Sequence, residues 1–322
     1  MSATPERFSI LGRSLDLQAS TPRLLAWLER QWSFPEHALP PVPYGIRLVE
    51  VDAPPGAPAG TPVPVPLHRM TLTALAGDDV WWFGDEGAGV QLRLGSVESR
   101  IAIWGAAHEQ ESAATMYAAL FVSIAESLRA SGLLPLHAAV AARAGRATVL
   151  AGPSGVGKST TLWRMARAGW APLAEDFAWL DPATCVVYGW DRGVRLWPET
   201  RERFAPEVPP ERFHTDLDGK LFLAYEHFPG PAVRAATVER LAVLERVTVD
   251  GATGGSTTNT ATPAAPAPLA PRDAVRAWWE SVGLPLSPAV RDQVARAIGT
   301  LVQRVDAVQL PIGPGPLVLE DA

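Results

Sequence analysis

The chain has 322 residues, of which 47 % are hydrophobic, so it can build two domains or one domain with substantial additions. Its formal net charge of −6 argues against a general nucleic-acid binder and against a binder of anionic membrane surfaces. The single cysteine, Cys185, excludes an intrachain disulfide framework and a cysteine-based zinc site, and it fits a reducing cytosol.

The sequence gives no sign of membrane insertion or export. The N-terminus lacks the basic start and apolar run of a signal peptide. The most apolar long stretch, residues 113–128, is too short to cross a bilayer, and Glu126 and Arg129 interrupt its end. We therefore expect a soluble, cytoplasmic protein in which this stretch is a buried helix.

The N-terminal third predicts a small α+β region over residues 1–110. It mixes strand-like runs at 8–11 and 45–51 with an amphipathic helix at 22–32, and its Pro/Gly-rich stretch 53–66 predicts an exposed loop. Alternating short runs then predict an antiparallel sheet; they lie at 71–75, 79–83, 90–94 and 99–104.

A long helix at 110–131 leads into the next part of the chain. After it, the runs 136–140 and 147–150 predict a hairpin that turns at Ala144-Gly145. The second of these strands feeds directly into the most informative stretch of the sequence.

That stretch is Gly-Pro-Ser-Gly-Val-Gly-Lys-Ser-Thr, which matches the phosphate-binding loop pattern G-x-x-x-x-G-K-S/T. A buried strand precedes it and a helix over 159–168, ended by Gly169, follows it, as the pattern requires. Glycines let bare backbone amides approach a polyanion, and the helix N-terminus adds partial positive charge. The predicted nucleotide-binding residues are Gly152, Ser154, Gly155, Val156, Gly157, Lys158, Ser159 and Thr160.

This pattern predicts ATP and Mg²⁺ as the cofactors. Lys158 would reach the β- and γ-phosphates, and the Ser159 hydroxyl would be a ligand of Mg²⁺. Only two of the 28 basic residues are lysines, Lys158 and Lys220. Because arginine replaces lysine almost everywhere else, a compact ammonium is expected to matter at both positions. Lys220 is therefore a candidate contact for substrate or phosphate, and the alternative is a turn lysine without a role.

An acidic pair follows the next predicted strand, at 170–174. One helical crossover joins this strand to the one before the loop, so the two should run parallel and end at the same edge of the sheet. Glu175 and Asp176 would then lie beside the phosphates, as ligands of Mg²⁺ or as a base for the acceptor hydroxyl. The alternative is two solvated acids at a strand end. For His137 the sequence leaves a core residue and a site residue open equally.

Beyond a hairpin at 177–180 and 185–190, the C-terminal part begins with a low-complexity run at 251–271 that predicts a flexible linker. Helices are expected at 273–283 and 288–305, and a strand around 308–310 that packs back on the core. The predicted organisation is an N-terminal region 1–110, a kinase core 111–250, the linker 251–271 and a helical segment 272–322.

Together these residues resemble the HPr serine kinase/phosphorylase family. The resemblance covers about residues 133–250 and rests on Leu136-His137, the 152–160 loop with its helix, and Leu173-Ala174-Glu175-Asp176. It implies a P-loop α/β core with a mixed sheet, shared with ATP-dependent phosphoenolpyruvate carboxykinase. Asp191-Arg192-Gly193 stands where the family has Glu-x-Arg-Gly, which makes Arg192 a candidate phosphate contact.

By resemblance, Glu175 and Asp176 supply the catalytic base and a metal-side carboxylate, with His137 nearby. We assign Ser159 and Asp176 to Mg²⁺ and count Lys158, Glu175, Asp176 and His137 as catalytic. The family usually has two aspartates, so Glu175 is one methylene longer. The N-terminal third differs from the phosphocarrier kinase, which indicates a divergent relative.

The predicted function is an ATP- and Mg²⁺-dependent kinase that phosphorylates a hydroxyl, preferably of serine, in a protein or peptide. One alternative is a nucleotide-binding regulatory or scaffold module without transfer, and another is a small-molecule kinase. No nucleic-acid or membrane partner is expected. Relatives form hexamers, so the resemblance also leaves a homo-oligomer open.

Overall fold

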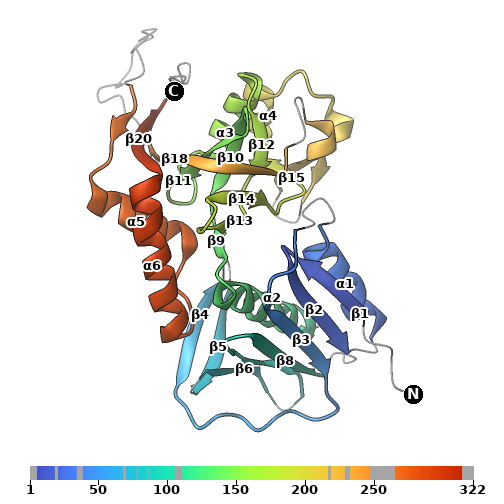
Figure 1. The fold of residues 1–322 in the computed structure, drawn as a ribbon. Helices are drawn as coiled ribbons and strands as arrows, with labels where there is room; N and C mark the ends of the chain where they lie inside the picture. Colours follow the sequence, from blue (N-terminus) through green and yellow to red (C-terminus); the bar gives the residue numbers. More distant parts are fainter. Residues whose placement is uncertain are drawn as a thin grey trace. The chain divides into compact units, whose positions relative to one another are not determined.

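The computed structural model describes residues 6–18, 21–34, 39–67, 70–77, 79–85, 87–105, 111–216, 219–228, 233–246 and 265–313. It has a mixed α/β fold with six α-helices among the described residues, which agrees with the predicted class (Figure 1). The chain divides into two compact units. The first contains Met1–Leu133 and Pro285–Gln293, and the second contains Leu134–Leu284 and Val294–Ala322.

The first unit contains an eight-stranded sheet in the order β1-β2-β3-β8-β7-β6-β5-β4. Pairs β2–β3 and β3–β8 are parallel, and the other neighbours are antiparallel. The strands are β1 (Glu6–Ile10), β2 (Arg13–Gln18), β3 (Gly45–Glu50), β4 (Pro62–Leu67), β5 (Met70–Gly77), β6 (Val80–Gly84), β7 (Gly89–Arg93) and β8 (Glu98–Trp104).

Two helices belong to this unit, α1 (Pro22–Trp32) and α2 (Glu111–Ala130). Helix α2 buries Met116, Leu120, Ile124 and Leu128, which recur every four residues and so share one face. That face packs against β6, β7 and β8. The apolar stretch read from the sequence is therefore a core helix, as predicted.

The Pro-rich stretch 53–66 was expected to be a loop, and this prediction is wrong for its last residues. Pro62, Pro64 and Pro66 alternate with Val63 and Val65 in β4, which pairs antiparallel with β5. Strand β4 is the last strand of the sheet, where prolines are tolerated because their missing N–H groups need no partner.

The main sheet of the second unit runs in the order β12-β10-β11-β18-β14-β13-β9, with β20 also paired to β18 and β19 to β20. Its strands are β9 (Leu134–Leu136), β10 (Ala139–Arg143), β11 (Arg146–Ala151), β12 (Ala171–Ala174), β13 (Ala178–Asp181), β14 (Val186–Gly189), β18 (Ala235–Arg246), β19 (Ala267–Pro268) and β20 (Asp306–Ile312).

Strand β12 runs in the predicted direction, but the strand next to it is β10 and not β11. Strand β10 is antiparallel to both β11 and β12, so β11 and β12 point the same way with β10 between them. Their carboxyl ends therefore lie on the same edge of the sheet. The parallel neighbour of β11 is β18, which comes much later in the chain.

The expected strand 136–140 is in fact two strands. Leu136 ends β9 and pairs with β13, whereas Ala139 begins β10 and pairs with β11. His137 lies at the break, and its backbone N–H donates to the Ser281 carbonyl at 2.8 Å. The predicted turn at Ala144-Gly145 is present, with positive φ at both residues, as a two-residue hairpin turn requires.

The remaining elements of the second unit pack around α3 (Lys158–Arg167). A small antiparallel sheet was not predicted; it consists of β15 (Gly193–Leu196), β17 (Leu221–Ala224) and β16 (His214–Thr215), and α4 (Pro198–Phe204) follows β15. Val194, Leu196 and Leu223 of this sheet join Leu162 and Trp163 of α3 in one buried cluster.

The C-terminal elements are close to the expected ones. Helices α5 (Pro271–Val282) and α6 (Pro288–Arg304) precede β20, which pairs in parallel with β18. Most of the predicted linker, 251–264, lies outside the described residues. The predicted domain boundaries stay a prediction, since the compact units are defined by packing and the first one extends to Leu133. No helix in the described part of the chain combines the length and apolar character that spanning a bilayer requires.

Candidate functional site

The loop over residues 152–160 joins the end of β11 to the start of α3. Gly152, Gly155 and Gly157 have φ angles of +144°, +78° and +119°, a region that side chains with a Cβ rarely adopt. Gly157 caps α3, and its carbonyl accepts from the Thr161 N–H. The loop therefore places the free amides of a helix N-terminus at the edge of the sheet.

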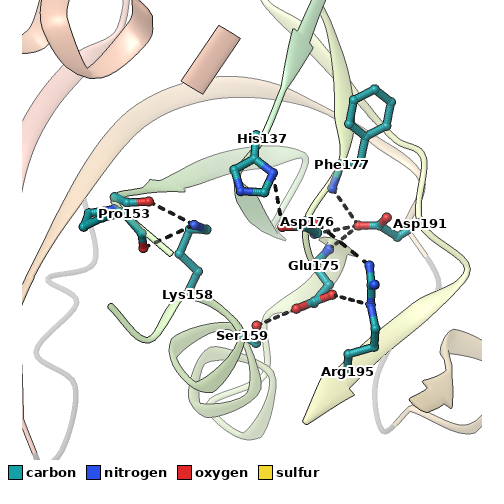
Figure 2. Close-up of polar contacts among 10 residues, drawn as sticks. His137, Pro153, Lys158, Ser159, Glu175, Asp176, Phe177, Asp191 and Arg195 are labelled. Carbon is teal, nitrogen blue, oxygen red and sulfur yellow. Dashed lines mark hydrogen bonds and ion pairs between the residues drawn. The ribbon is translucent and has the colours of Figure 1, made fainter. Parts of the chain in front are cut away.

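Lys158 lies across this loop. Its residue is 8 % exposed, and Nζ donates to the Gly152 carbonyl at 2.9 Å and to the Pro153 carbonyl at 3.5 Å (Figure 2). Burial lowers the pKa of the ammonium, and the nearby Asp176 and Glu175 carboxylates act in the opposite direction. The remaining predicted loop residues are less enclosed: Ser154 is exposed, and Val156 and Thr160 are half-buried.

Glu175 faces the start of α3. The Ser159 hydroxyl donates to Glu175 Oε1 at 2.5 Å, and Arg195 Nε lies 3.4 Å from Oε2 (Figure 2). Glu175 is 6 % exposed, and this burial raises its pKa to about 7, although the Ser159 hydrogen bond lowers it. Near neutral pH, Glu175 is therefore a carboxyl group that can gain or lose a proton.

Asp176 lies beside His137 and shares Arg195 with Glu175. His137 Nδ1 lies 3.3 Å from Asp176 Oδ1, and an Arg195 terminal nitrogen lies 3.9 Å from Oδ2. Its side chain is 34 % exposed, so solvent or a second reactant can reach it. His137 is therefore an exposed residue beside the acidic pair, and its catalytic role stays a prediction.

Asp191 fixes the bend that carries both acids. Its Oδ2 atom accepts the backbone N–H groups of three consecutive residues, Glu175, Asp176 and Phe177, at 2.8, 2.6 and 2.8 Å. Burial raises the pKa of Asp191 to about 6, against the lowering effect of these hydrogen bonds. An extended strand would point neighbouring side chains to opposite faces. The bend instead lets Glu175 and Asp176 face the same region.

Arg195 was missed by the sequence reasoning. Arg195 is the half-exposed residue of β15, between Val194 and Leu196, which pack in the core, so its side chain points to the other face of the strand. Burial lowers the pKa of its guanidinium, but four carboxylates outweigh this effect and the net shift is upward. The only advance signal was a charged residue in an otherwise apolar strand.

The two other predicted cations lie elsewhere. Arg192 is exposed, and its carbonyl accepts the Tyr225 N–H at 3.1 Å. Lys220 places its ammonium over the Trp197 ring, 5.3 Å from the centroid, on the small sheet. The guanidinium that meets the acidic pair belongs to Arg195, and the roles of Arg192 and Lys220 stay predictions.

The residues present fit Mg²⁺ held together with a nucleotide. Among the described residues, no group of three or more His, Cys, Asp or Glu side chains could hold a metal alone. Mg²⁺, however, usually binds one or two protein oxygens plus phosphates and water. The Ser159 hydroxyl and the neighbouring carboxylates are a donor set of that kind.

Comparison with known proteins adds little. No protein-family model matches the chain, and no curated protein matches it either. Among solved structures it is similar to the Hpr(Ser) kinase/phosphatase from Coxiella burnetii, with 12 % identity over 56 % of this chain and 81 % of that one. The TM-score is 0.26, and a likeness of this degree carries no argument about activity.

Proposed function

We propose that the chain is an ATP- and Mg²⁺-dependent kinase that transfers the γ-phosphoryl group to a hydroxyl, with serine in a protein or peptide as the preferred acceptor. The observation that carries the proposal is the meeting of the glycine-rich loop and the acidic pair. Ser159, at the start of α3, donates to Glu175, and Asp176 lies next to it with one exposed side. Phosphoryl transfer needs this combination of anion cradle and carboxylates.

The loop residues bind and orient the triphosphate. Their backbone N–H groups hold its oxygens, and the Lys158 ammonium exchanges the Gly152 and Pro153 carbonyls for phosphate oxygens. Ser159 and a carboxylate of the pair would hold Mg²⁺, which supplies positive charge against the phosphates. Lys158 and Glu175 are buried, which strengthens the charge interactions that they make.

The contacts favour a division of labour between the two acids that differs from the sequence hypothesis. Glu175 is buried against Ser159, which suits the metal side, whereas Asp176 is exposed and suits the acceptor side. Asp176 takes the proton of the acceptor hydroxyl while the hydroxyl oxygen forms a bond to the γ-phosphorus. The bond between this phosphorus and the bridging oxygen breaks, and ADP leaves. His137 and Arg195 hold Asp176 in place.

The test is transfer from γ-labelled ATP in lysate of the source cell, followed by identification of the labelled species. Lys158→Ala should abolish both ATP binding and transfer. Asp176→Asn should leave ATP binding within about threefold and lower transfer at least about a hundredfold, as loss of a general base does. The matched control is Asp181→Asn, because Asp181 is a half-exposed aspartate at the end of β13 whose Oδ1 accepts from the Ala183 N–H. Near-wild-type transfer in Asp176→Asn would remove the base assignment.

A second candidate is a nucleotide-binding module without transfer. The Ser159–Glu175 hydrogen bond favours it, because it engages the hydroxyl that a metal ion would need. Tight ATP binding by the purified chain, with no labelled product in the lysate, would support this reading over the kinase.

A further inference from the structure

A cavity lies at the amino ends of three neighbouring parallel strands of the second unit. Its volume is about 410 Å³, and it is lined by residues at the starts of β11 and β20 and by the early part of β18. The 152–160 loop follows the opposite end of β11, roughly 17 Å away at the usual rise per strand residue. The cavity is therefore separate from the candidate kinase site.

Three guanidinium groups line this cavity, from Arg146, Arg240 and Arg304. Two carboxylates, of Glu239 and Asp306, share the lining and leave an excess of positive charge. Arg146 pairs with Glu239 at 3.5 Å; both side chains are about half exposed, so this ion pair is weak.

Arg240 has a hydrogen-bond donor that is not satisfied within the described part of the chain. Its Nε–H is buried and has no hydrogen-bond acceptor among the described residues. A buried donor without an acceptor is destabilising, and a ligand oxygen would reach it only after the Arg240 side chain shifts toward the cavity that it lines. Arg304 donates one terminal N–H to the Ala183 carbonyl at 2.9 Å, which anchors its guanidinium at the cavity.

We propose that this cavity binds a small polyanion with at least two phosphate or carboxylate groups. Guanidinium forks match the paired oxygens of both groups, and three of them around one space can hold two anionic groups at once. A volume of several hundred cubic ångströms is usual for small-molecule sites. This site requires neither ATP nor transfer, so it holds whether or not the chain is a kinase.

The experiment is calorimetric titration of the full-length Lys158→Ala chain, without Mg²⁺, with inorganic pyrophosphate in one arm and citrate in the other. The Lys158→Ala change suppresses anion binding at the 152–160 loop. At least one probe should bind with a dissociation constant below about 1 mM. Adding Arg240→Gln should weaken that binding about tenfold or more, the usual effect of losing one charged hydrogen bond. The arm that binds identifies the phosphate or the carboxylate chemistry.

Arg296→Gln is the matched control, because Arg296 is an exposed arginine on α6, the helix that carries Arg304. It should leave affinity unchanged. Absence of binding by both probes, or equal weakening by Arg296→Gln, overturns the proposal. Circular dichroism verifies folding; should Arg240→Gln fail to fold, Arg304→Gln replaces it, with the same tenfold loss expected.

Discussion

Two carboxyl groups of the second unit, those of buried Glu175 and half-buried Asp191, have pKa values raised toward neutrality. Glu175 is raised to about 7 and Asp191 to about 6, in both cases chiefly by burial. The two groups lie close together, because Asp191 accepts the backbone N–H of Glu175 in the bend at 175–177. The charge of this region therefore changes as the pH passes through about 6 and 7.

The first prediction concerns stability against pH. The folded pKa of Glu175 lies above its ordinary value of 4.5, so folded chains bind the proton more tightly than unfolded ones. Its contribution is fully present below about pH 4.5 and is lost as pH rises through about 7. In nucleotide-free protein, Glu175→Gln should gain stability relative to wild type between pH 5 and pH 8, by up to about 3 kcal/mol.

Urea unfolding at several pH values measures this difference. The matched control is Glu239→Gln, because the Glu239 side chain is about half exposed. Its stability difference from wild type should be small, because an exposed ion pair contributes little. A constant difference between Glu175→Gln and wild type from pH 5 to pH 8 would contradict the prediction.

The second prediction separates positioning from binding. Asp191→Asn removes the charged acceptor of three backbone N–H groups, so the 175–177 bend should loosen. Stability should fall by about 2 kcal/mol, the cost of weakening buried hydrogen bonds to a charge. Transfer should slow while the dissociation constant for ATP stays within about threefold, because the 152–160 loop is untouched. Equal losses in binding and transfer would point to a general structural defect.

The sequence predicted the site only in part. Sequence reasoning could find four of its residues because a local pattern and one strand crossover bring them together. These are Lys158, Ser159, Glu175 and Asp176. Asp191 entered only as part of the Asp191-Arg192-Gly193 segment, which stands where the family has Glu-x-Arg-Gly. Its acceptor role depends on the packing of β12 against the segment after β14, which no local pattern encodes. Arg195 was missed for the same reason, since it reaches the acids from a separate sheet.

At the scale of elements, the start of α3 depends on a backbone that only glycine adopts readily. The third prediction is that Gly157→Ala destabilises the chain by about 1–3 kcal/mol and weakens ATP binding. Its φ is +119°, and a Cβ would lie 3.1 Å from Ile312 Cδ1.

Gly299→Ala provides the comparison within the same chain. Gly299 lies inside α6 with open space around the added Cβ, so this change should stabilise the chain by about 0.5–1 kcal/mol. Denaturant unfolding and calorimetry measure both variants. An unchanged Gly157→Ala protein would show that the loop tolerates a side chain and is not a tight anion cradle.

Local patterns predicted element type better than element pairing. Helices α1, α5 and α6 were predicted from apolar spacing. Strand β4 did not, because proline-rich composition suggests a loop unless the strand is known to lie at an edge. The break between β9 and β10 could not be predicted either, since Leu136 and Ala139 belong to one apolar run. In the structure they pair with different strands.

At the scale of the whole molecule, the second unit is not continuous in sequence. Residues 285–293 belong to the first unit, where Glu126 Oε2 accepts the Leu286 N–H at 3.0 Å and Arg129 and Asp79 contact Gln293 and Ser287. Glu126 is buried, and burial raises its pKa. A cut at residue 133 therefore cannot separate the two units cleanly.

The fourth prediction follows from this connectivity. A fragment of residues 134–322 loses every first-unit partner of the segment 285–293, and buried Val290 becomes exposed. Its melting temperature should lie at least roughly 5 °C below that of the full chain, as a loss of one or two kcal/mol implies for this size. Differential scanning calorimetry makes the comparison. A fragment that melts at the full-chain temperature would show that the second unit is independent.

The scarcity of lysine has a practical consequence. Amine-directed acylation meets only two side chains, one enclosed by its own loop carbonyls and the other lying over the Trp197 ring. Lys220 should therefore be modified first, and modification of Lys158 should report when its loop opens. Peptide mass spectrometry could then follow the loop in untreated lysate, without a dye or an engineered tag.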